Sequence, residues 1–351
     1  MIGFYCATPY HVMTAINLML SKYEGKRAKL YILNHTKDAI ALVKRLQKSG
    51  LFEDVVFINN SNVTLSMRFK RVWEAFIPNP QIRQIGRNEA YTEFIFFCYD
   101  FLNATYLVKQ LRKKNSACQF AFGDDGLGSY MEDIYTPNKV VMFLLRLTGR
   151  KKYLTLINQL FVFMPELVFA NKQLQTSKIP KYQYKNERFR SIVNEIWPLD
   201  ALLEQPLLYF QQPIYGEQAK RVAAMEKQLF ARLSEMSLPF AVKLHPLTYN
   251  YDACPAAQLV HSKIPFECFI LQQRSDDKVL ISYFSTALFT PFMLFDQTPR
   301  LVFLYELTDG SDDILPQYRM FLERFINIYP DQANICVPQS LEELVAFLKT
   351  R

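Results

Sequence analysis

Short apolar runs alternate with helix-like segments along this chain of 351 residues, and the alternation restricts the fold more than any other feature. In the first half, apolar runs occupy residues 2–6, 30–33, 55–58, 94–98 and 119–122, and helical spacing covers residues 10–22, 37–48 and 104–113. Continuous apolar runs between helices are typical of a parallel sheet with both faces covered. The first half is therefore predicted to be an α/β domain with doubly wound topology.

The alternation begins again after a polar stretch, residues 171–190, that is rich in lysine and arginine. Strand-like runs follow at residues 207–211, 240–244, 279–281 and 301–305, with helical segments at 217–236, from about 285, at 316–326 and at 341–349. We interpret the polar stretch as a linker between domains of residues 1–190 and 191–351, a division that suits a chain of this length. The predicted fold class is α/β, with two doubly wound, Rossmann-like domains facing a cleft, as in the GT-B type.

Glycine is scarce, at 10 of 351 residues, so that a cluster of glycines is informative. Three of the ten lie in the segment 123–129 (GDDGLGS), directly after a predicted strand. Neighbouring carboxylates at the carboxyl end of a parallel strand lie where α/β sheets bind ligands, and one of such a pair is suited to act as a general base. Asp124 and Asp125 are therefore candidate catalytic residues. A GxGxxG or GxxxxGK[ST] motif is absent, which disfavours dinucleotide and P-loop sites.

Three further loops follow predicted strands of the second half. His245 comes after the strand at 240–244 and can donate a proton or hydrogen bond to a leaving phosphate. The hydroxyl-rich segment 282–286 (SYFST) precedes a helix, and hydroxyls with free N–H groups at a helix start are suited to phosphate. Glu217 stands in the loop that opens the second domain, where it is either a helix-start acid or a second candidate base.

The segment 139–165 combines an apolar run with arginines and lysines, and the whole chain has a net charge of +8. A basic amphipathic helix pair is suited to an anionic membrane surface, whereas burial between domains or in a dimer interface is the alternative. No apolar stretch long enough to span a membrane is present, and the N-terminus does not resemble a signal peptide. The basic residues are dispersed and no nucleic-acid-binding signature occurs, so nucleic acid is not an expected partner.

The six cysteines are widely spaced without a CxxC, as in proteins with reduced thiols, and no zinc-type histidine spacing occurs among the four histidines.

The order of the loops resembles the bacterial lipooligosaccharide sialyltransferases, glycosyltransferase family 52. The segments that carry the resemblance are 6–9 (CATP), 124–128 (DDGLG), 245–246 (HP) and 284–287 (FSTA). The resemblance implies an inverting transfer of sialic acid from CMP-sialic acid to a terminal galactoside of a bacterial surface glycan, lipooligosaccharide or capsule. It also implies an enzyme of the bacterial cytoplasm or of the inner face of its membrane, with a homodimer as a further expectation. No cofactor or metal is expected, since the donor has one phosphate and the sequence has no DxD.

The resemblance also implies roles for single residues. His245 would assist departure of the phosphate, Ser285 and Thr286 would bind it, and Pro246 would lie on the cytidine side. The base would be Asp124 or Asp125, with Glu217 ranked second. The further predicted donor-binding residues are Thr8, Gly126, Gly128, Lys243 and Ser282.

Two other functions remain open from the sequence. One is transfer from another nucleotide donor, such as CDP-glycerol, in glycan-polymer synthesis. The other is a non-enzymatic, basic protein that binds membranes peripherally through the segment 139–165.

Overall fold

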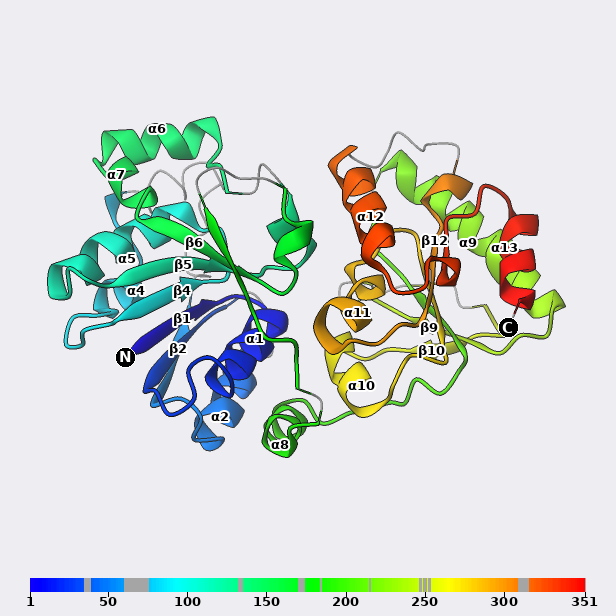
Figure 1. Ribbon diagram of the computed structural model, residues 1–351, viewed down its shortest axis with the longest axis horizontal. Coiled ribbons are helices and arrows are strands. Elements are labelled where there is room, and N and C mark those ends of the chain that lie inside the picture. The colour runs from blue at the N-terminus through cyan, green and yellow to red at the C-terminus, as the bar shows by residue number, and fades with distance from the viewer. Residues whose placement is uncertain are drawn as a thin grey trace. The chain divides into compact units, whose positions relative to one another are not determined.

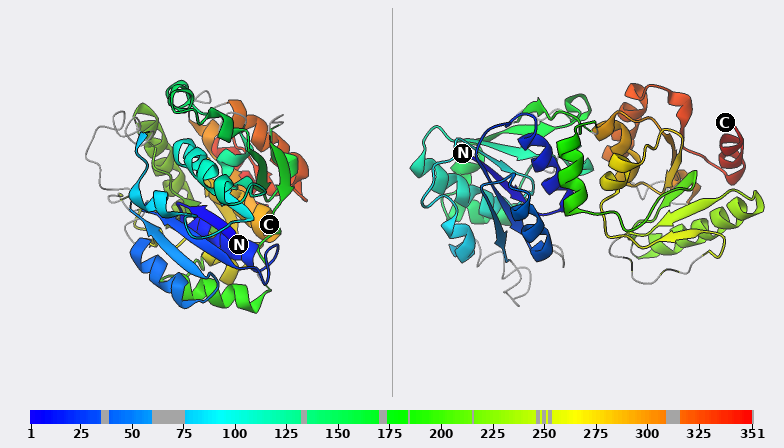
Figure 2. Two further views of the ribbon diagram at one scale, coloured as in Figure 1. Left: turned by 90° about the vertical axis from the view of Figure 1, so that its left-hand side faces the viewer. Right: turned by 90° about the horizontal axis from the view of Figure 1, so that it is seen from below.

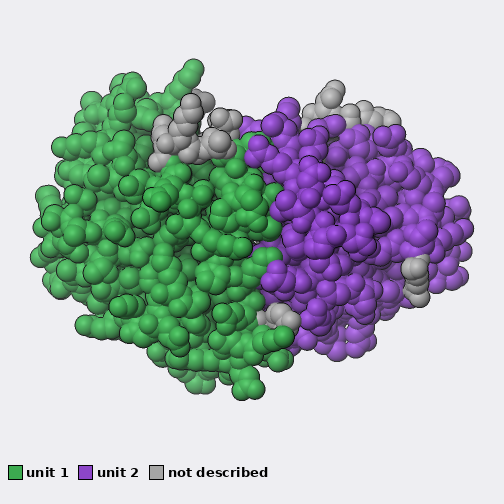
Figure 3. Space-filling view, viewed as in Figure 1, with its two compact units in different colours: residues 1–196 green, residues 197–351 purple. Residues whose placement is uncertain are grey.

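A computed structural model describes residues 1–34, 39–59, 76–131, 135–169, 174–183, 185–214, 216–245, 248, 251, 254–308 and 316–350. The chain forms two compact units, Met1–Ile196 and Trp197–Arg351 (Figures 1 and 3). Each unit is a parallel sheet with helices on its faces (Figure 2).

The sheet of the first unit has seven strands in the order β3-β2-β1-β4-β5-β6-β7, and every pairing is parallel. The strands are β1 (Ile2–Cys6), β2 (Ala28–Leu33), β3 (Asp54–Ile58), β4 (Glu93–Phe96), β5 (Gln119–Gly123), β6 (Ile157–Val162) and β7 (Gln175–Lys178). The order reverses between β1 and β4, which makes their carboxyl ends the topological switch point where such sheets bind ligands.

The helices of the first unit fall into two groups (Figure 1). One group packs together as α1 (Pro9–Met19), α2 (Ala39–Lys48) and α8 (Glu187–Ile196), and the other comprises α4 (Pro80–Gln84), α5 (Phe101–Lys114), α6 (Lys139–Leu147) and α7 (Lys151–Leu154). The unit also contains the short 3-10 turns η1 (Leu127–Tyr130) and η2 (Pro165–Leu167). The centre of the sheet between the helix groups is apolar, and all five residues of β1 are buried.

The second unit repeats the topology with six parallel strands in the order β10-β9-β8-β11-β12-β13. They are β8 (Leu207–Phe210), β9 (Phe240–Lys243), β10 (Gln258–Val260), β11 (Val279–Ser282), β12 (Arg300–Phe303) and β13 (Ile335–Cys336). The helices are α9 (Glu217–Glu235), α10 (Phe266–Gln272), α11 (Thr290–Phe295), α12 (Pro316–Ile328) and α13 (Leu341–Lys349), with η3 (Thr286–Leu288), η4 (Tyr305–Leu307) and η6 (Gln332–Asn334). Here the order reverses between β8 and β11.

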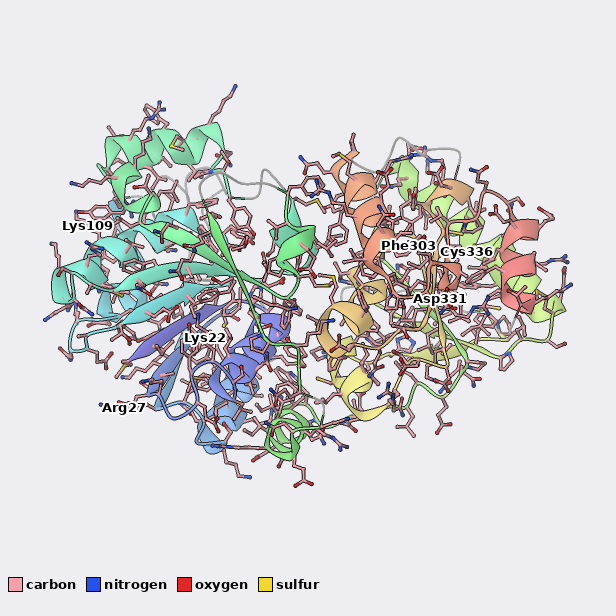
Figure 4. All side chains as sticks on the ribbon, viewed as in Figure 1. Lys22, Arg27, Lys109, Phe303, Asp331 and Cys336 are labelled. Carbon is pink, nitrogen blue, oxygen red and sulfur yellow. The ribbon has the colours of Figure 1, made fainter. Side chains whose placement is uncertain are left out.

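Aromatic rings fix the helices of the second unit on its sheet. Neighbouring residues of β8 point to opposite faces: Tyr209 packs on Phe230 of α9 at 5.1 Å between ring centroids, and Phe210 packs on Phe266 of α10 at 4.4 Å. Phe303 of β12, which is labelled in Figure 4, packs on Phe289 at 5.1 Å between ring centroids. Burying one such side chain contributes about 1.5–3 kcal/mol, so these pairs hold the strand ends in fixed positions.

The predicted fold class, two doubly wound α/β domains, is confirmed by the two sheet orders. The predicted linker, residues 171–190, is wrong in part, because it contains the edge strand β7 and the start of α8, which packs on α1 and α2. Packing on these helices places α8 in the first unit, so the division follows residue 196 rather than 190. The segment 139–165 begins with a helix pair as predicted, but its residues 157–162 form strand β6 inside the sheet.

Candidate active site

The loop after β5 holds two neighbouring acids in very different surroundings. Asp124 is completely buried and accepts four hydrogen bonds, from the hydroxyls of Tyr10 (3.1 Å) and Tyr130 (2.6 Å) and from the backbone N–H groups of Gly126 (2.8 Å) and Phe163 (3.3 Å). Burial raises the pKa of Asp124 to about 6, although these hydrogen bonds favour its charged form. Asp124 therefore anchors the loop to β6 and α1.

Asp125 differs from its neighbour, because its side chain is 29% exposed. Its backbone N–H donates to Ser129 Oγ at 2.7 Å, and its Oδ1 lies in hydrogen-bond contact with His11 Nε2. Of the predicted acid pair, Asp125 is thus the one whose carboxylate is accessible from solvent.

Two of the loop's glycines shape this arrangement. Gly126 has φ +87° and ψ −152°, a backbone conformation that is essentially restricted to glycine. A Cβ built on Gly123 would lie 2.4 Å from the ring of Phe97, so the loop begins against the neighbouring strand's end. Gly128 lies in the turn η1, whose Ser129 receives the Asp125 N–H.

His11 was not among the residues predicted from the sequence, yet it lies at the centre of this site. It is 1% exposed, it stands in the first turn of α1, and its ring stacks on Phe97 at 5.6 Å between centroids. Thr8, a predicted donor-binding residue, is the N-cap of this helix, and its Oγ1 accepts the His11 N–H at 3.3 Å. The capping spacing Thr8 to His11 was a signal for the helix start, but nothing local indicated the contact with Asp125.

In the second unit, His245 follows β9 and is half-buried. Its backbone N–H donates to Gln211 Oε1 at 3.3 Å, and the Thr248 hydroxyl donates to the same oxygen at 2.6 Å. Burial lowers the pKa of His245, and the positive charge of Lys243 lowers it further. The loop after β8 thus holds the loop after β9 through Gln211, a residue that sequence reasoning missed.

Lys243 and Ser282, two predicted donor-binding residues, point into the unit instead. The Lys243 ammonium donates to the Ser262 carbonyl oxygen at 3.3 Å and lies 5.7 Å from the Phe269 ring centroid. The Ser282 hydroxyl is fully buried and donates to the Phe210 carbonyl oxygen at 2.8 Å. Both side chains therefore serve the packing of the sheet in this structure.

The loop after β11 presents Ser285 and Thr286 at the start of η3. Ser285 caps the turn, its Oγ accepting the Ala287 N–H at 3.3 Å, and Thr286 is exposed. Gln212 holds this loop: its Oε1 accepts the Phe284 N–H at 2.7 Å, and its amide donates to the Phe284 carbonyl oxygen at 2.8 Å. The loops after β8, β9 and β11 are thereby joined at one sheet edge, on either side of the switch point.

Glu217 begins α9 at that same sheet edge, because α9 follows β8 and β8 pairs with β9. Its side chain is 78% exposed and pairs with Lys220 at 2.8 Å. Pro246 lies outside the described residues. Within the described part of the chain, no three His, Cys, Asp or Glu side chains gather as metal ligands would.

Solved structures with similar folds have very different sequences. The spinosyn forosaminyltransferase SpnP aligns over 99% of both chains with 8% identity and a TM-score of 0.53. UDP-GlcNAc 2-epimerase from Neisseria meningitidis aligns over the full length of both chains with 10% identity and a TM-score of 0.51. The glycosyltransferase of kitacinnamycin aligns over 99% of this chain and 93% of its own, with 10% identity and a TM-score of 0.50. These likenesses confirm the GT-B type of fold, and the epimerase among them illustrates that this fold alone does not decide the reaction.

No curated protein matches the sequence. The model of the family described as alpha-2,8-polysialyltransferase (POLYST) matches residues 4–299, which include Thr8, the acid loop, His245 and Ser285. The prediction of a sialyltransferase family is thus confirmed, although the matching family is not the lipooligosaccharide family that the loops resemble. The chain belongs to the alpha-2,8-polysialyltransferase family and is a glycosyltransferase.

Proposed function

We propose that this protein transfers sialic acid from CMP-sialic acid to a hydroxyl group of a glycan, with inversion at the anomeric carbon. The observation that carries the proposal is the partly exposed Asp125 carboxylate in contact with buried His11, at the carboxyl edge of a doubly wound sheet in a chain of a sialyltransferase family. In one displacement, the acceptor oxygen bonds to the anomeric carbon while the bond from that carbon to the CMP phosphate oxygen breaks. The acceptor proton passes to a carboxylate, and CMP leaves.

Asp125 is the preferred base among the three predicted acids. Asp124 is enclosed by donors and has no exposed surface, so an acceptor hydroxyl has no access to it. Glu217 is exposed to water and paired with Lys220, without a surrounding that orients its carboxylate. A base must lie within hydrogen-bond reach of the proton that it takes, which favours the oriented carboxylate of Asp125.

His245 is the group proposed to meet the departing phosphate. In its neutral form the His245 ring still offers one N–H donor. A neighbouring phosphate would stabilise the protonated ring and so oppose the lowering of its pKa by Lys243. The Ser285 and Thr286 hydroxyls and the N–H groups that begin η3 are the proposed further donors to phosphate. A single phosphate leaves with CMP, so these donors suffice and the reaction is predicted to need no metal.

Two acceptor classes follow from different observations. The resemblance of the loops to lipooligosaccharide sialyltransferases favours a terminal galactoside of a bacterial surface glycan. The name of the matching family favours a terminal sialic acid, extended through an α2,8 linkage. The family match also favours sialyl transfer over transfer from CDP-glycerol and over a purely membrane-binding role.

The experiment presents CMP-sialic acid with lactose, or with sialyllactose, in EDTA or in Mg²⁺, and identifies products by mass spectrometry. Transfer to lactose supports the galactoside, and transfer to sialyllactose alone supports the α2,8 extension. CDP-glycerol serves as the control donor. Failure to transfer sialic acid to either acceptor, with turnover of CDP-glycerol, would contradict the proposal, and a strict requirement for Mg²⁺ would contradict the metal-free mechanism.

We also propose that α6 contacts anionic membrane on the cytoplasmic side. Val140, Phe143 and Leu147 are 57%, 62% and 60% exposed and share one helix face, whereas Val141, Leu144 and Leu145 face the unit's interior. Lys139, Arg146, Lys151 and Lys152 are exposed beside this row, and each basic residue near an anionic surface contributes about 1 kcal/mol. None of the helices in the described ranges is both long and apolar enough to span a bilayer.

Vesicle sedimentation tests this surface. Phe143→Glu is expected to weaken binding to phosphatidylserine vesicles at least tenfold without changing transfer to a soluble acceptor. Ile40→Glu, which alters an equally exposed apolar residue (59%) on α2, is the matched control. Equal binding by both variants would contradict the assignment.

A further inference from the structure

We propose that His11 is a positioning residue that holds the Asp125 carboxylate in place through a fixed hydrogen on Nε2. The inference rests on the proposed function for the role of Asp125 as base, but the contact itself is part of the structure. His11 Nε2 and Asp125 Oδ1 are in hydrogen-bond contact, although the residues are 114 positions apart in the sequence. This contact joins the loop after β5 to the helix that follows β1.

The surroundings of the ring decide which nitrogen carries the hydrogen. The Nδ1 atom accepts two backbone N–H groups, those of Ala7 (3.1 Å) and Thr8 (3.3 Å). A nitrogen that accepts hydrogen bonds carries no hydrogen itself, so the neutral ring has its hydrogen on Nε2. That hydrogen points at Asp125, and the imidazole is therefore a donor to the carboxylate.

The same geometry excludes a proton relay through His11. Nε2 already carries a hydrogen, and a proton on Nδ1 would face the Ala7 and Thr8 N–H groups and break the start of α1. A proton that Asp125 takes from an acceptor hydroxyl therefore stays on the carboxyl group until it leaves for solvent. The Asp125 Oδ2 atom, which has no hydrogen bond to any other described residue, is the oxygen assigned to this step.

The first turn of α1 holds both acids of the loop at once. The Tyr10 hydroxyl donates to Asp124, and the next residue, His11, donates to Asp125. The His11 ring is also fixed by stacking on Phe97 and by its burial, so it has little freedom to follow a moving carboxylate. A fixed donor of this kind orients Oδ1 and thereby aims Oδ2, and a displacement of about 1 Å in such a group can reduce turnover about 100-fold.

The test separates orientation of Asp125 from stability of α1. His11→Phe retains an aromatic ring that can stack on Phe97 but removes the donor. His11→Gln retains an N–H donor at a similar reach and is the rescue variant. Asn17→Ala is the matched control, because it removes a hydrogen bond of a buried residue of the same helix (Asn17 Nδ2 to the Pro180 carbonyl oxygen, 2.7 Å) far along α1 from Asp125.

The expected result is a loss of about 100-fold in kcat for sialyl transfer in His11→Phe, with KM for CMP-sialic acid within about threefold of the original. His11→Gln should recover at least tenfold of this loss, and Asn17→Ala should retain kcat while lowering the melting temperature. Equal losses of kcat in His11→Phe and Asn17→Ala, or no rescue by Gln, would reduce His11 to a structural residue and overturn the proposal.

A second measurement is independent of any substrate. In the full chain labelled with ¹⁵N-histidine, the His11 resonances, assigned by their loss in His11→Gln, should report a hydrogen on Nε2. Asp125→Asn should shift the Nε2–H signal, because its partner changes from a carboxylate to an amide. A hydrogen on Nδ1, or an Nε2–H signal unaffected by Asp125→Asn, would overturn the contact. If the protein transfers no sialic acid at all, the proposed function fails, while these spectra still decide the His11–Asp125 arrangement.

Discussion

The buried carboxylate of Asp124 predicts a pH dependence of stability that can be isolated with one substitution. Burial raises its pKa from the ordinary value of 3.8 to about 6. Between these two pH values, Asp124 therefore binds a proton more readily in the folded protein than in the unfolded chain. The contribution of this group to stability is fully present below about pH 4 and is lost as the pH rises through about 6.

The size of the effect follows from the same values. Each pH unit of difference corresponds to about 1.4 kcal/mol, so a gap of about two units corresponds to about 3 kcal/mol. Asp124→Asn retains the shape of the side chain and one accepting oxygen, and it carries no charge at any of these pH values. At pH 4 the unfolded carboxyl is already partly ionised, so the free energy of unfolding of the original protein should fall by about 2.4 kcal/mol relative to Asp124→Asn between pH 4 and pH 7.

Urea unfolding at pH 4, 5, 6 and 7, followed by circular dichroism, measures this difference directly. Subtracting the variant removes the titration of all other groups that both proteins share. Glu217→Gln is the comparison variant, because its side chain is 78% exposed and its removal changes no buried charge. The assignment of Asp124 as a buried, proton-binding anchor would be refuted by either of two results. One is a difference in free energy of unfolding that stays constant with pH, and the other is an original protein that becomes more stable relative to the variant as the pH rises.

Three further predictions concern the loops. Asp125→Asn should lower kcat by at least about 100-fold, as expected for loss of a general base, while leaving CMP binding unchanged by calorimetry; full turnover would return the role of base to Glu217. Gly126→Ala should lower the free energy of unfolding by about 1–3 kcal/mol. The cause would be backbone strain alone, since the added Cβ would meet no atom within 4 Å, and an unchanged melting temperature would show that the strain is absent. Gln212→Ala should weaken CMP binding by loosening the Phe284 backbone, and unaltered affinity would separate that loop from the donor site.

Most of the strands that could be predicted have side chains that are buried on both faces. The apolar run 2–6 agrees with β1 to the residue, and the runs before Asp124 and His245 agree with β5 and β9 to within one residue at their ends. Strand β7 (QTSK) was missed because it is an edge strand with exposed polar side chains, and its composition is that of a linker. Strand β6 was missed because Asn158 and Gln159 interrupt its apolar residues where the strand begins.

The candidate site could be predicted by position more reliably than by role. Strand ends place Asp124, Asp125, His245 and Ser285 at sheet edges, because parallel strands bring their carboxyl ends to one side. Burial decides the roles, and burial of adjacent residues depends on distant segments: Tyr10 and Phe163 enclose Asp124, and His11 reaches Asp125 from α1. Lys243 turns to Ser262 for the same reason, since its direction is set by packing against α10 rather than by its neighbour His245.

We propose that this chain moves sialic acid from CMP-sialic acid with Asp125 as base and His245 at the phosphate. The most direct test measures CMP release by the original protein, by Asp125→Asn and by His245→Ala, with and without acceptor, in EDTA. We expect acceptor-stimulated release by the original protein, with a reduction of about 100-fold or more in both variants, which remain folded. Absence of acceptor-stimulated release from the original protein, or undiminished release by both variants, would contradict it.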